Sequence, residues 1–236
     1  MATDALPERR RWQLAVGGVL ATLAVANVMS NRVLPSWAYV PWSLVVALTV
    51  VMIARRSVSM DQMGFTEWRR GAAWGGVLFA LTLVVLAVAA LMPVFSEMYH
   101  DRRVNGGAVE FVYQALIRIP FGTAVLEETA FRAVLPALFA VRWGVLRGCV
   151  AASVCFGLWH VLPSLGLTKV NPAATRILGS GHAGVVAAVV FAVVGTALAG
   201  LWWCWIRYRA RSILATMVAH VATNSVAYTI AWLVTR

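Results

Sequence analysis

The sequence predicts an all-α protein, a polytopic membrane helix bundle with about seven transmembrane helices. Of its 236 residues, 61% are hydrophobic and only 12% are charged, and the mean hydropathy is +0.79. Such a composition is typical of integral membrane proteins. The basic residues, which give a net charge of +11, lie between long apolar runs. A nucleic-acid-binding protein can be equally basic, but it would not carry this much apolar sequence, so we expect no nucleic-acid partner.

Hydropathy divides the chain into seven apolar segments that are long enough to span a bilayer. They lie near residues 12–30, 36–54, 73–95, 110–140, 146–163, 184–206 and 212–234. The first follows the basic cluster Arg9–Arg11, and no small-residue cleavage site comes after it. We therefore expect a retained signal anchor that forms the first helix. Residues 55–72 mix apolar and basic side chains, which indicates a linker that lies on the anionic inner surface of the membrane.

The fourth segment is too long for one straight crossing. A helix over residues 110–140 would reach about 46 Å, whereas the hydrocarbon core is about 30 Å thick. Pro120 and Gly122 are the expected break or kink. The part before them, which contains Gln114 and Arg118, is then expected to lie near an interface.

The distribution of basic residues predicts a multi-pass protein of the cell membrane with a cytoplasmic N-terminus and an external C-terminus. In this orientation twelve basic residues lie inside: Arg9, Arg10, Arg11, Arg55, Arg56, Arg69, Arg70, Arg142, Arg147, Arg207, Arg209 and Arg211. Six lie outside: Arg32, Arg102, Arg103, Lys169, Arg176 and Arg236. The loop 164–183 is then the longest external connection.

Glu127 and Glu128 differ from the other seven acidic residues because they lie within an apolar run. One charged residue at the centre of a membrane helix costs about 2.5–3.5 kcal/mol, and two adjacent carboxylates also repel each other. Such a pair requires a partner or a water-filled cavity. Arg132 follows Glu128 by four residues, so the two share a helix face in the favourable order. A purely structural salt bridge is the alternative interpretation of this pair.

Two histidines lie in other apolar segments at a comparable depth. His160 is in the fifth segment and His220 in the seventh, and Asn224 follows His220 by one helical turn. Measured from the expected cytoplasmic helix ends, Glu127, His160 and His220 lie about 22, 20 and 13 Å into the membrane. We therefore expect these side chains to form one site.

The residue types of this site suit hydrolysis by an activated water. A carboxylate and a neutral imidazole hold a water and take its proton. A second histidine and an asparagine donate hydrogen bonds to an oxyanion. Glu127, His160 and His220 are also ordinary zinc ligands, so a zinc site is the alternative. The helix motif H-E-x-x-H of many metalloproteases is absent from the sequence.

Three motifs in order resemble those of the CAAX-processing and bacteriocin-processing (CPBP, also called Abi) intramembrane endopeptidases. That family carries E-E-x-x-x-R, then F-x-x-x-H, then H-x-x-x-N, on successive membrane helices. The corresponding residues here run from Glu127 to Arg132, from Phe156 to His160 and from His220 to Asn224. One departure is Ala133, where many members have glycine.

The resemblance implies a role for each matching residue. Glu127 would activate water as general base together with His160, and His220 with Asn224 would stabilise the oxyanion. Glu128, Arg132 and Phe156 would shape the site. A cavity that opens toward the cytoplasm and the membrane would admit water and the substrate. Residues 110–236 would be the catalytic membrane core, preceded by N-terminal helices and a linker over 1–109, in one integrated bundle.

The predicted function is therefore intramembrane endopeptidase activity on a membrane-associated peptide or protein. We expect no cofactor. Some members of the family are called metalloproteases, and a bound zinc ion is the alternative. The Arg-rich, Lys-poor composition is typical of high-GC bacteria, in which a prenylated substrate is not expected. Peptide maturation, immunity to a peptide toxin and cleavage of a membrane regulator are candidate roles. A non-enzymatic immunity or scaffold protein and a proton-coupled transporter are the alternative functions. The sequence leaves the oligomeric state and the substrate open.

Overall fold

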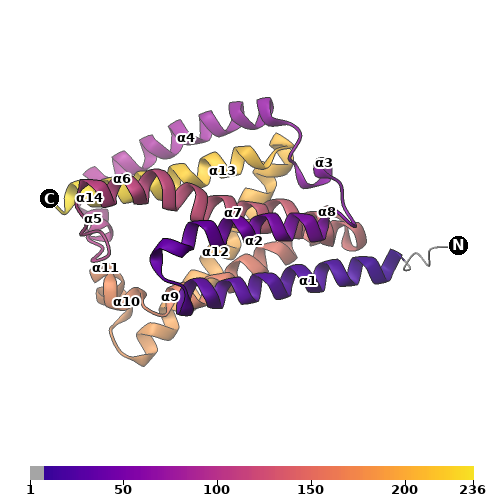
Figure 1. Ribbon diagram of the computed structural model, residues 1–236. Helices are drawn as coiled ribbons and strands as arrows, with labels where there is room; N and C mark the ends of the chain where they lie inside the picture. Colours follow the sequence, from indigo (N-terminus) through magenta and orange to yellow (C-terminus); the bar gives the residue numbers. More distant parts are fainter. Residues whose placement is uncertain (1–7) are drawn as a thin grey trace, which may run out of the picture.

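The chain, described over residues 8–236 by a computed structural model, folds into a bundle of helices (Figure 1). Within this range there is no β-strand, in agreement with the all-α prediction. Six helical stretches are long and apolar enough to cross a membrane: Glu8–Val33, Ser36–Ala54, Met60–Leu91, Ala108–Ser164, His182–Ala210 and Ile213–Val234. The described chain is therefore a multi-pass membrane bundle, as predicted.

The first half of the chain supplies three of these stretches. Its elements are α1 (Glu8–Val28), η1 (Met29–Val33), η2 (Ser36–Ala38), α2 (Tyr39–Ala54), α3 (Met60–Met63), α4 (Trp68–Leu91), α5 (Pro93–Ser96) and η3 (Glu97–Tyr99). The linker region contains α3, which begins with a capping box between Ser59 and Gln62. The N-terminal end of α1, the α3 region and the turn within α8 lie at one end of the bundle, and the C-terminus lies at the other (Figure 1).

The second half contains the predicted site. Its elements are α6 (Ala108–Tyr113), η4 (Gln114–Ala124), α7 (Val125–Glu128), η5 (Thr129–Val134), α8 (Leu135–Trp159), α9 (Val161–Ser164), α10 (Leu167–Val170), α11 (Pro172–Leu178), α12 (His182–Ala210), α13 (Ile213–Val221), η6 (Ala222–Val226) and α14 (Ala227–Val234). The elements η4, η5 and η6 are π-helical, with hydrogen bonds from residue i to i+5. Much of the expected external loop is helical, as α10 and α11.

Two of the seven predicted crossings lie in the single stretch Ala108–Ser164. Gly144 interrupts it with φ +75° and ψ 165°, a conformation that glycine adopts without steric cost. The chain folds back on itself at this residue. The close contact between the two arms shows the reversal, since a Cβ added to Gly148 would lie only 2.9 Å from the carbonyl oxygen of Pro136. The segments 110–140 and 146–163 are therefore two arms of a helical hairpin, which reconciles six stretches with about seven crossings.

Of the break or kink expected at Pro120 and Gly122, the break does not form. The helix continues through both residues as the π-helical turns of η4. The wider winding accommodates a proline, which lacks an N–H and crowds the preceding turn of an α-helix. Gly122 instead allows a close approach of α2, since a Cβ there would lie 2.7 Å from Cδ1 of Tyr39.

The outer surface of the bundle is apolar. In the most apolar window of Met60–Leu91 only 6% of the residues are buried inside the protein, and in His182–Ala210 only 17% are. Among the large side chains, Leu91 is 84% exposed and Phe191 is 67% exposed. These helices present their apolar side chains outward, which is the arrangement required when the surrounding solvent is lipid.

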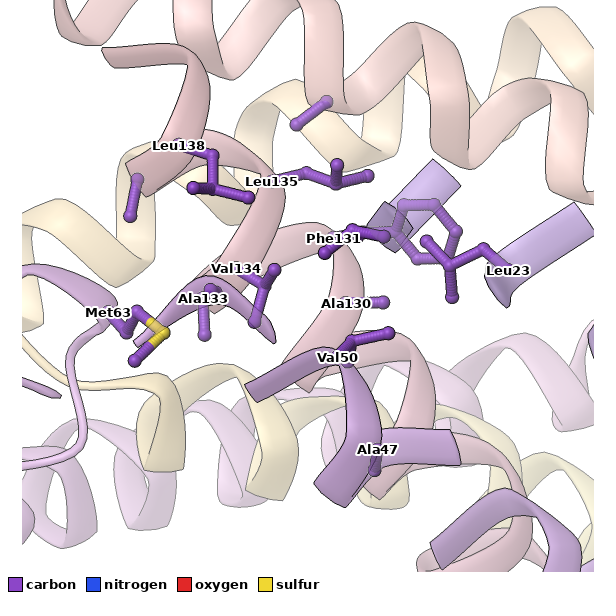
Figure 2. Packing of buried hydrophobic residues seen from close by; sticks show 14 of the residues in the cluster. Leu23, Ala47, Val50, Met63, Ala130, Phe131, Ala133, Val134, Leu135 and Leu138 are labelled. Carbon is purple, nitrogen blue, oxygen red and sulfur yellow. The ribbon is translucent and has the colours of Figure 1, made fainter. Parts of the chain in front are cut away.

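The buried core is centred on η5, directly after the acidic pair (Figure 2). Phe131 and Val134 of η5 are at most 2% exposed and belong to one cluster with Leu23 of α1, Val50 of α2 and Met63 of α3. Small residues between them, Ala130 and Ala133, are fully buried. Dense packing on this side of η5 fixes the helix that carries the two glutamates and directs their carboxylates toward α8 and α13.

Candidate active site

The acidic pair lies on α7, a single turn of helix between η4 and η5. Both side chains are enclosed, since Glu127 is 7% exposed and Glu128 is 0% exposed. Their partners come from distant parts of the chain, namely the end of α8 and the middle of α13. The bundle thus provides the polar contacts that two carboxylates in an apolar setting require. Single π turns inside α-helices are frequent at functional sites, and here π-helical segments flank the pair on both sides.

Glu128 contacts one histidine and one arginine. His220 Nδ1 lies 2.8 Å from Glu128 Oε1, and Arg132 Nε lies 3.5 Å from Glu128 Oε2. The second contact is the i,i+4 ion pair expected from the sequence. An ionised carboxylate only accepts hydrogen bonds, so His220 donates through Nδ1 when Glu128 is ionised.

Arg132 lies between two aromatic rings and is 1% exposed. Its Cζ atom is 3.8 Å from the centre of the Phe156 ring and 5.4 Å from the centre of the Trp203 ring. Neither Nε nor Nη1 has a hydrogen-bond partner among the described residues. The rings and the Glu128 carboxylate together compensate the buried guanidinium, which is the cation–π arrangement that arginine favours when desolvated.

Each oxygen of Glu127 faces a different neighbour. The indole Nε1 of Trp159 donates a hydrogen bond of 3.0 Å to Oε1. The second oxygen, Oε2, lies 3.7 Å from Nε2 of His220. His220 therefore stands between the two carboxylates, with one ring nitrogen directed toward each, and the edge of its ring contacts Trp203 at 5.0 Å between centres.

His160 is placed at the end of α8, one turn after Phe156. Its Nδ1 lies 2.8 Å from the carbonyl oxygen of Phe156, and the two rings meet edge to face at 4.7 Å. A carbonyl oxygen cannot donate, so Nδ1 carries a proton, and in a neutral ring Nε2 is then an acceptor. Within residues 8–236 no hydrogen bond or ion pair joins His160 to Glu127.

Asn224 lies on η6, one turn after His220, and lines a cavity of about 710 Å³. The cavity also contacts Tyr99, Val104 and Ala231, which pack together, and Ala231 belongs to α14 at the end of the bundle where the C-terminus lies (Figure 1). With a cytoplasmic N-terminus, this cavity would lie toward the outer side of the membrane.

The described residues do not form a preassembled metal site. No group of three or more His, Cys, Asp or Glu side chains in residues 8–236 is arranged to hold a metal ion. Of the predicted zinc ligands, His220 Nδ1 is engaged by Glu128 and Glu127 Oε1 accepts from Trp159. In the described part of the chain, no hydrogen bond or ion pair joins His160 to either of them. The set Glu127, His160 and His220 therefore fits a zinc ion only after rearrangement.

Two tryptophans of the site were not predicted from the sequence. Trp159 contacts Glu127, and Trp203 contacts both His220 and Arg132. Trp159 directly precedes His160 in the second motif, and a buried indole N–H requires a hydrogen-bond acceptor. A polar contact of Trp159 within the site could therefore have been predicted. Trp203 lies on α12, outside the three motifs, among several other tryptophans, and nothing in the sequence distinguishes it.

The comparison with protein families adds independent information. Residues 109–226, half of the chain, match the family described as Type II CAAX prenyl endopeptidase Rce1-like. The chain belongs to this family. All three motifs lie inside the matched range, which confirms the resemblance to CAAX-processing endopeptidases. At the family level, a Rce1-like protein is an intramembrane endopeptidase. Neither the curated proteins nor the solved structures contain a match to the chain.

Proposed function

We propose that the chain hydrolyses a peptide bond of a membrane-associated peptide or protein with a water molecule activated by Glu127. The observation that carries the proposal is the buried series of contacts from Trp159 through Glu127, His220 and Glu128 to Arg132. A structural salt bridge accounts for Glu128 and Arg132 alone. It does not account for the second carboxylate, whose Oε2 faces an imidazole without a close hydrogen bond.

In the proposed mechanism His220 acts as an imidazolium. Two carboxylates and the Arg132 guanidinium leave a net charge of −1, and an imidazolium brings the sum to zero. Neutrality matters because isolated charges are costly where all these side chains are less than a tenth exposed. In this form both ring nitrogens of His220 donate, Nδ1 to Glu128 and Nε2 toward the reaction centre.

These groups supply each step of hydrolysis. Glu127 takes a proton from water while the water oxygen attacks the peptide carbonyl carbon, and His160 Nε2 orients the same water. His220 Nε2 and the Asn224 amide donate hydrogen bonds to the oxyanion that develops. The C–N bond then breaks, the carbonyl reforms, and Glu127 transfers its proton to the leaving nitrogen. Glu128 and Arg132 keep His220 in place.

We propose that this reaction proceeds without a metal. The arrangement of ligands supports the proposal: His220 Nε2 and Glu127 Oε2 face each other, but within residues 8–236 no group of three His, Cys, Asp or Glu side chains is placed to hold a metal ion. The purified protein is expected to stay active after exhaustive chelation. Metal analysis of the same sample verifies that the metal has been removed. Loss of activity that returns on addition of zinc would contradict a metal-free mechanism.

The variant Glu127→Gln tests the function, since it preserves size and removes the base. Membrane peptides of cells that express the wild type, Glu127→Gln or the control Glu67→Gln are compared by mass spectrometry. Glu67 is exposed before α4, so its substitution leaves the site intact. We expect cleavage products with the wild type and Glu67→Gln, and none with Glu127→Gln. A scaffold or immunity protein would keep its cellular phenotype in Glu127→Gln, and a transporter would show Glu127-dependent flux in proteoliposomes.

A further inference from the structure

The cavity that ends at Asn224 contains a cation that the proposed mechanism does not use. Arg118 on η4 is partly buried and lines this cavity. Its Nη1 donates to Gln114 Oε1 at 3.3 Å, and its Cζ lies 4.4 Å from the centre of the Tyr39 ring. In the described part of the chain no carboxylate lies within ion-pair distance of Arg118. A guanidinium has five N–H donors, so most of them remain available to a ligand.

The other charges of the cavity lining compensate each other. Asp101 and Arg103 form an ion pair of 2.7 Å, and the remaining lining residues apart from Arg118 are uncharged. The net charge of the lining is therefore +1, and it is located on Arg118. A cation without a carboxylate partner in a cavity inside an apolar bundle favours an anionic ligand.

Arg118 and the reaction centre share one wall of the bundle. Ser225 of η6 donates a hydrogen bond of 2.8 Å to the carbonyl oxygen of Ala115 on η4, which holds the two π-helical segments side by side next to Asn224. Arg118 precedes Glu127 by nine residues on a continuous helix, which corresponds to about 13 Å. An extended peptide covers about 3.3–3.6 Å per residue, so this distance equals about four residues.

We infer that Arg118 binds a carboxylate of the substrate about four residues from the scissile bond and thereby selects peptides that carry one there. The inference rests on the proposed endopeptidase function. Arginine suits this role because its planar fork pairs with both oxygens of a carboxylate, and the Tyr39 ring together with Gln114 orients it in advance. The carboxylate comes either from the C-terminus of the peptide or from an Asp or Glu side chain.

The test uses N-palmitoylated decapeptides of mixed sequence in phosphatidylcholine proteoliposomes, with cleavage followed by mass spectrometry. Four peptide pools combine a free or amidated C-terminus with the presence or absence of Asp and Glu. The wild type is expected to cleave carboxylate-bearing peptides about 10–100-fold faster than fully neutral ones, the range of a charged hydrogen bond. The two sources are distinguished by which pool is preferred.

The variant Arg118→Gln is expected to lose this preference, and its cleavage of neutral peptides shows that it folds. Arg118→Lys is expected to keep part of the preference, because it keeps the charge without the fork. Arg142→Gln at the opposite end of the bundle is the matched control and retains the full preference.

A preference that persists in Arg118→Gln, or equal cleavage of all pools by the wild type, would refute the role of Arg118 and leave the proposed function standing. If Arg118→Gln cleaves none of the peptide pools, Arg118→Lys and Arg118→Met decide the question. Full wild-type selectivity in both would refute the role of Arg118. Reduced selectivity in Arg118→Lys would support that role. Cleavage that is absent in the wild type, or unchanged in Glu127→Gln, would refute the proposed function and this inference with it.

Discussion

Replacement of Arg132 by methionine is the change whose energetic effect follows most directly from the structure. Arg132 Nε lies 3.5 Å from Glu128 Oε2, and the two side chains are 1% and 0% exposed. Two unit charges at 3.5 Å attract each other by about 5 kcal/mol at an effective dielectric constant of about 20. Removal of one partner of a buried pair typically costs about 3–5 kcal/mol, because the other charge stays buried without compensation.

We therefore expect Arg132→Met to lower the free energy of unfolding by about 3–5 kcal/mol. Methionine keeps apolar contact with Phe156 and Trp203, so the loss reports the charge more than the volume. Unfolding in mixed detergent micelles, followed by tryptophan fluorescence, measures the effect. The control Arg176→Met removes an exposed partner of Glu97 and is expected to cost less than about 1 kcal/mol.

A double-mutant cycle decides whether the ion pair is the cause. Glu128→Gln combined with Arg132→Met leaves no unpaired charge at this contact, so the double variant is expected to lose less stability than the sum of the single variants. The expected coupling is at least about 1 kcal/mol. Additive losses, or an Arg132→Met variant as stable as Arg176→Met, would refute the charge-compensation account of the site.

Three further predictions concern other parts of the molecule. Trp159→Phe keeps the ring but leaves the buried Oε1 of Glu127 without its donor, so kcat/KM is expected to fall about 10–100-fold and the free energy of unfolding by about 1–3 kcal/mol. Wild-type values of both would contradict the role of this hydrogen bond. Gly144→Ala forces a side chain onto φ +75° and ψ 165°, a region that only glycine adopts readily, while the added Cβ meets no atom within 4 Å. We therefore expect the free energy of unfolding to fall by about 1–3 kcal/mol from backbone strain alone. Unchanged stability would contradict this conformation of the hairpin turn. Burial alone would raise the pKa of Asp101, but the hydrogen bonds and charge of Arg103 lower it overall. A lowered folded-state pKa stabilises the fold above the ordinary value of about 3.9, and this contribution is lost as the pH falls below it. The stability difference between wild type and Asp101→Asn is therefore expected to shrink between pH 6 and pH 3, and a difference independent of pH would contradict the role of this ion pair.

The sequence predicted the architecture because the bilayer imposes a strong constraint on composition and segment length. At the fourth segment a proline and a glycine in apolar sequence indicated a break or kink, and the helix is not broken there. The structure accommodates Pro120 in π-helical turns and reverses the chain at Gly144 instead. The local sequence does not show which glycine adopts a positive φ, because the packing of the neighbouring helices decides where the chain turns.

The contents of the candidate site were also partly predictable. The spacing of Glu128 and Arg132 predicted their ion pair, since one helix determines it. The position of His220 between both glutamates depends on the approach of α13 to α7, and the contact of Trp159 with Glu127 depends on the end of α8. Such contacts between helices distant in sequence follow from packing, which motif spacing does not encode. The cavity beside Asn224 has the same origin.

The most direct measurement of the central claim is the rate of peptide cleavage by the purified, reconstituted protein and its Glu127→Gln variant. General-base catalysis typically contributes about 100–10,000-fold, so we expect Glu127→Gln to lose at least about 100-fold in kcat/KM. Glu67→Gln is expected to match the wild type, and all three proteins are expected to unfold at similar denaturant concentrations. Cleavage by Glu127→Gln at the wild-type rate would contradict the assignment of Glu127 as the base.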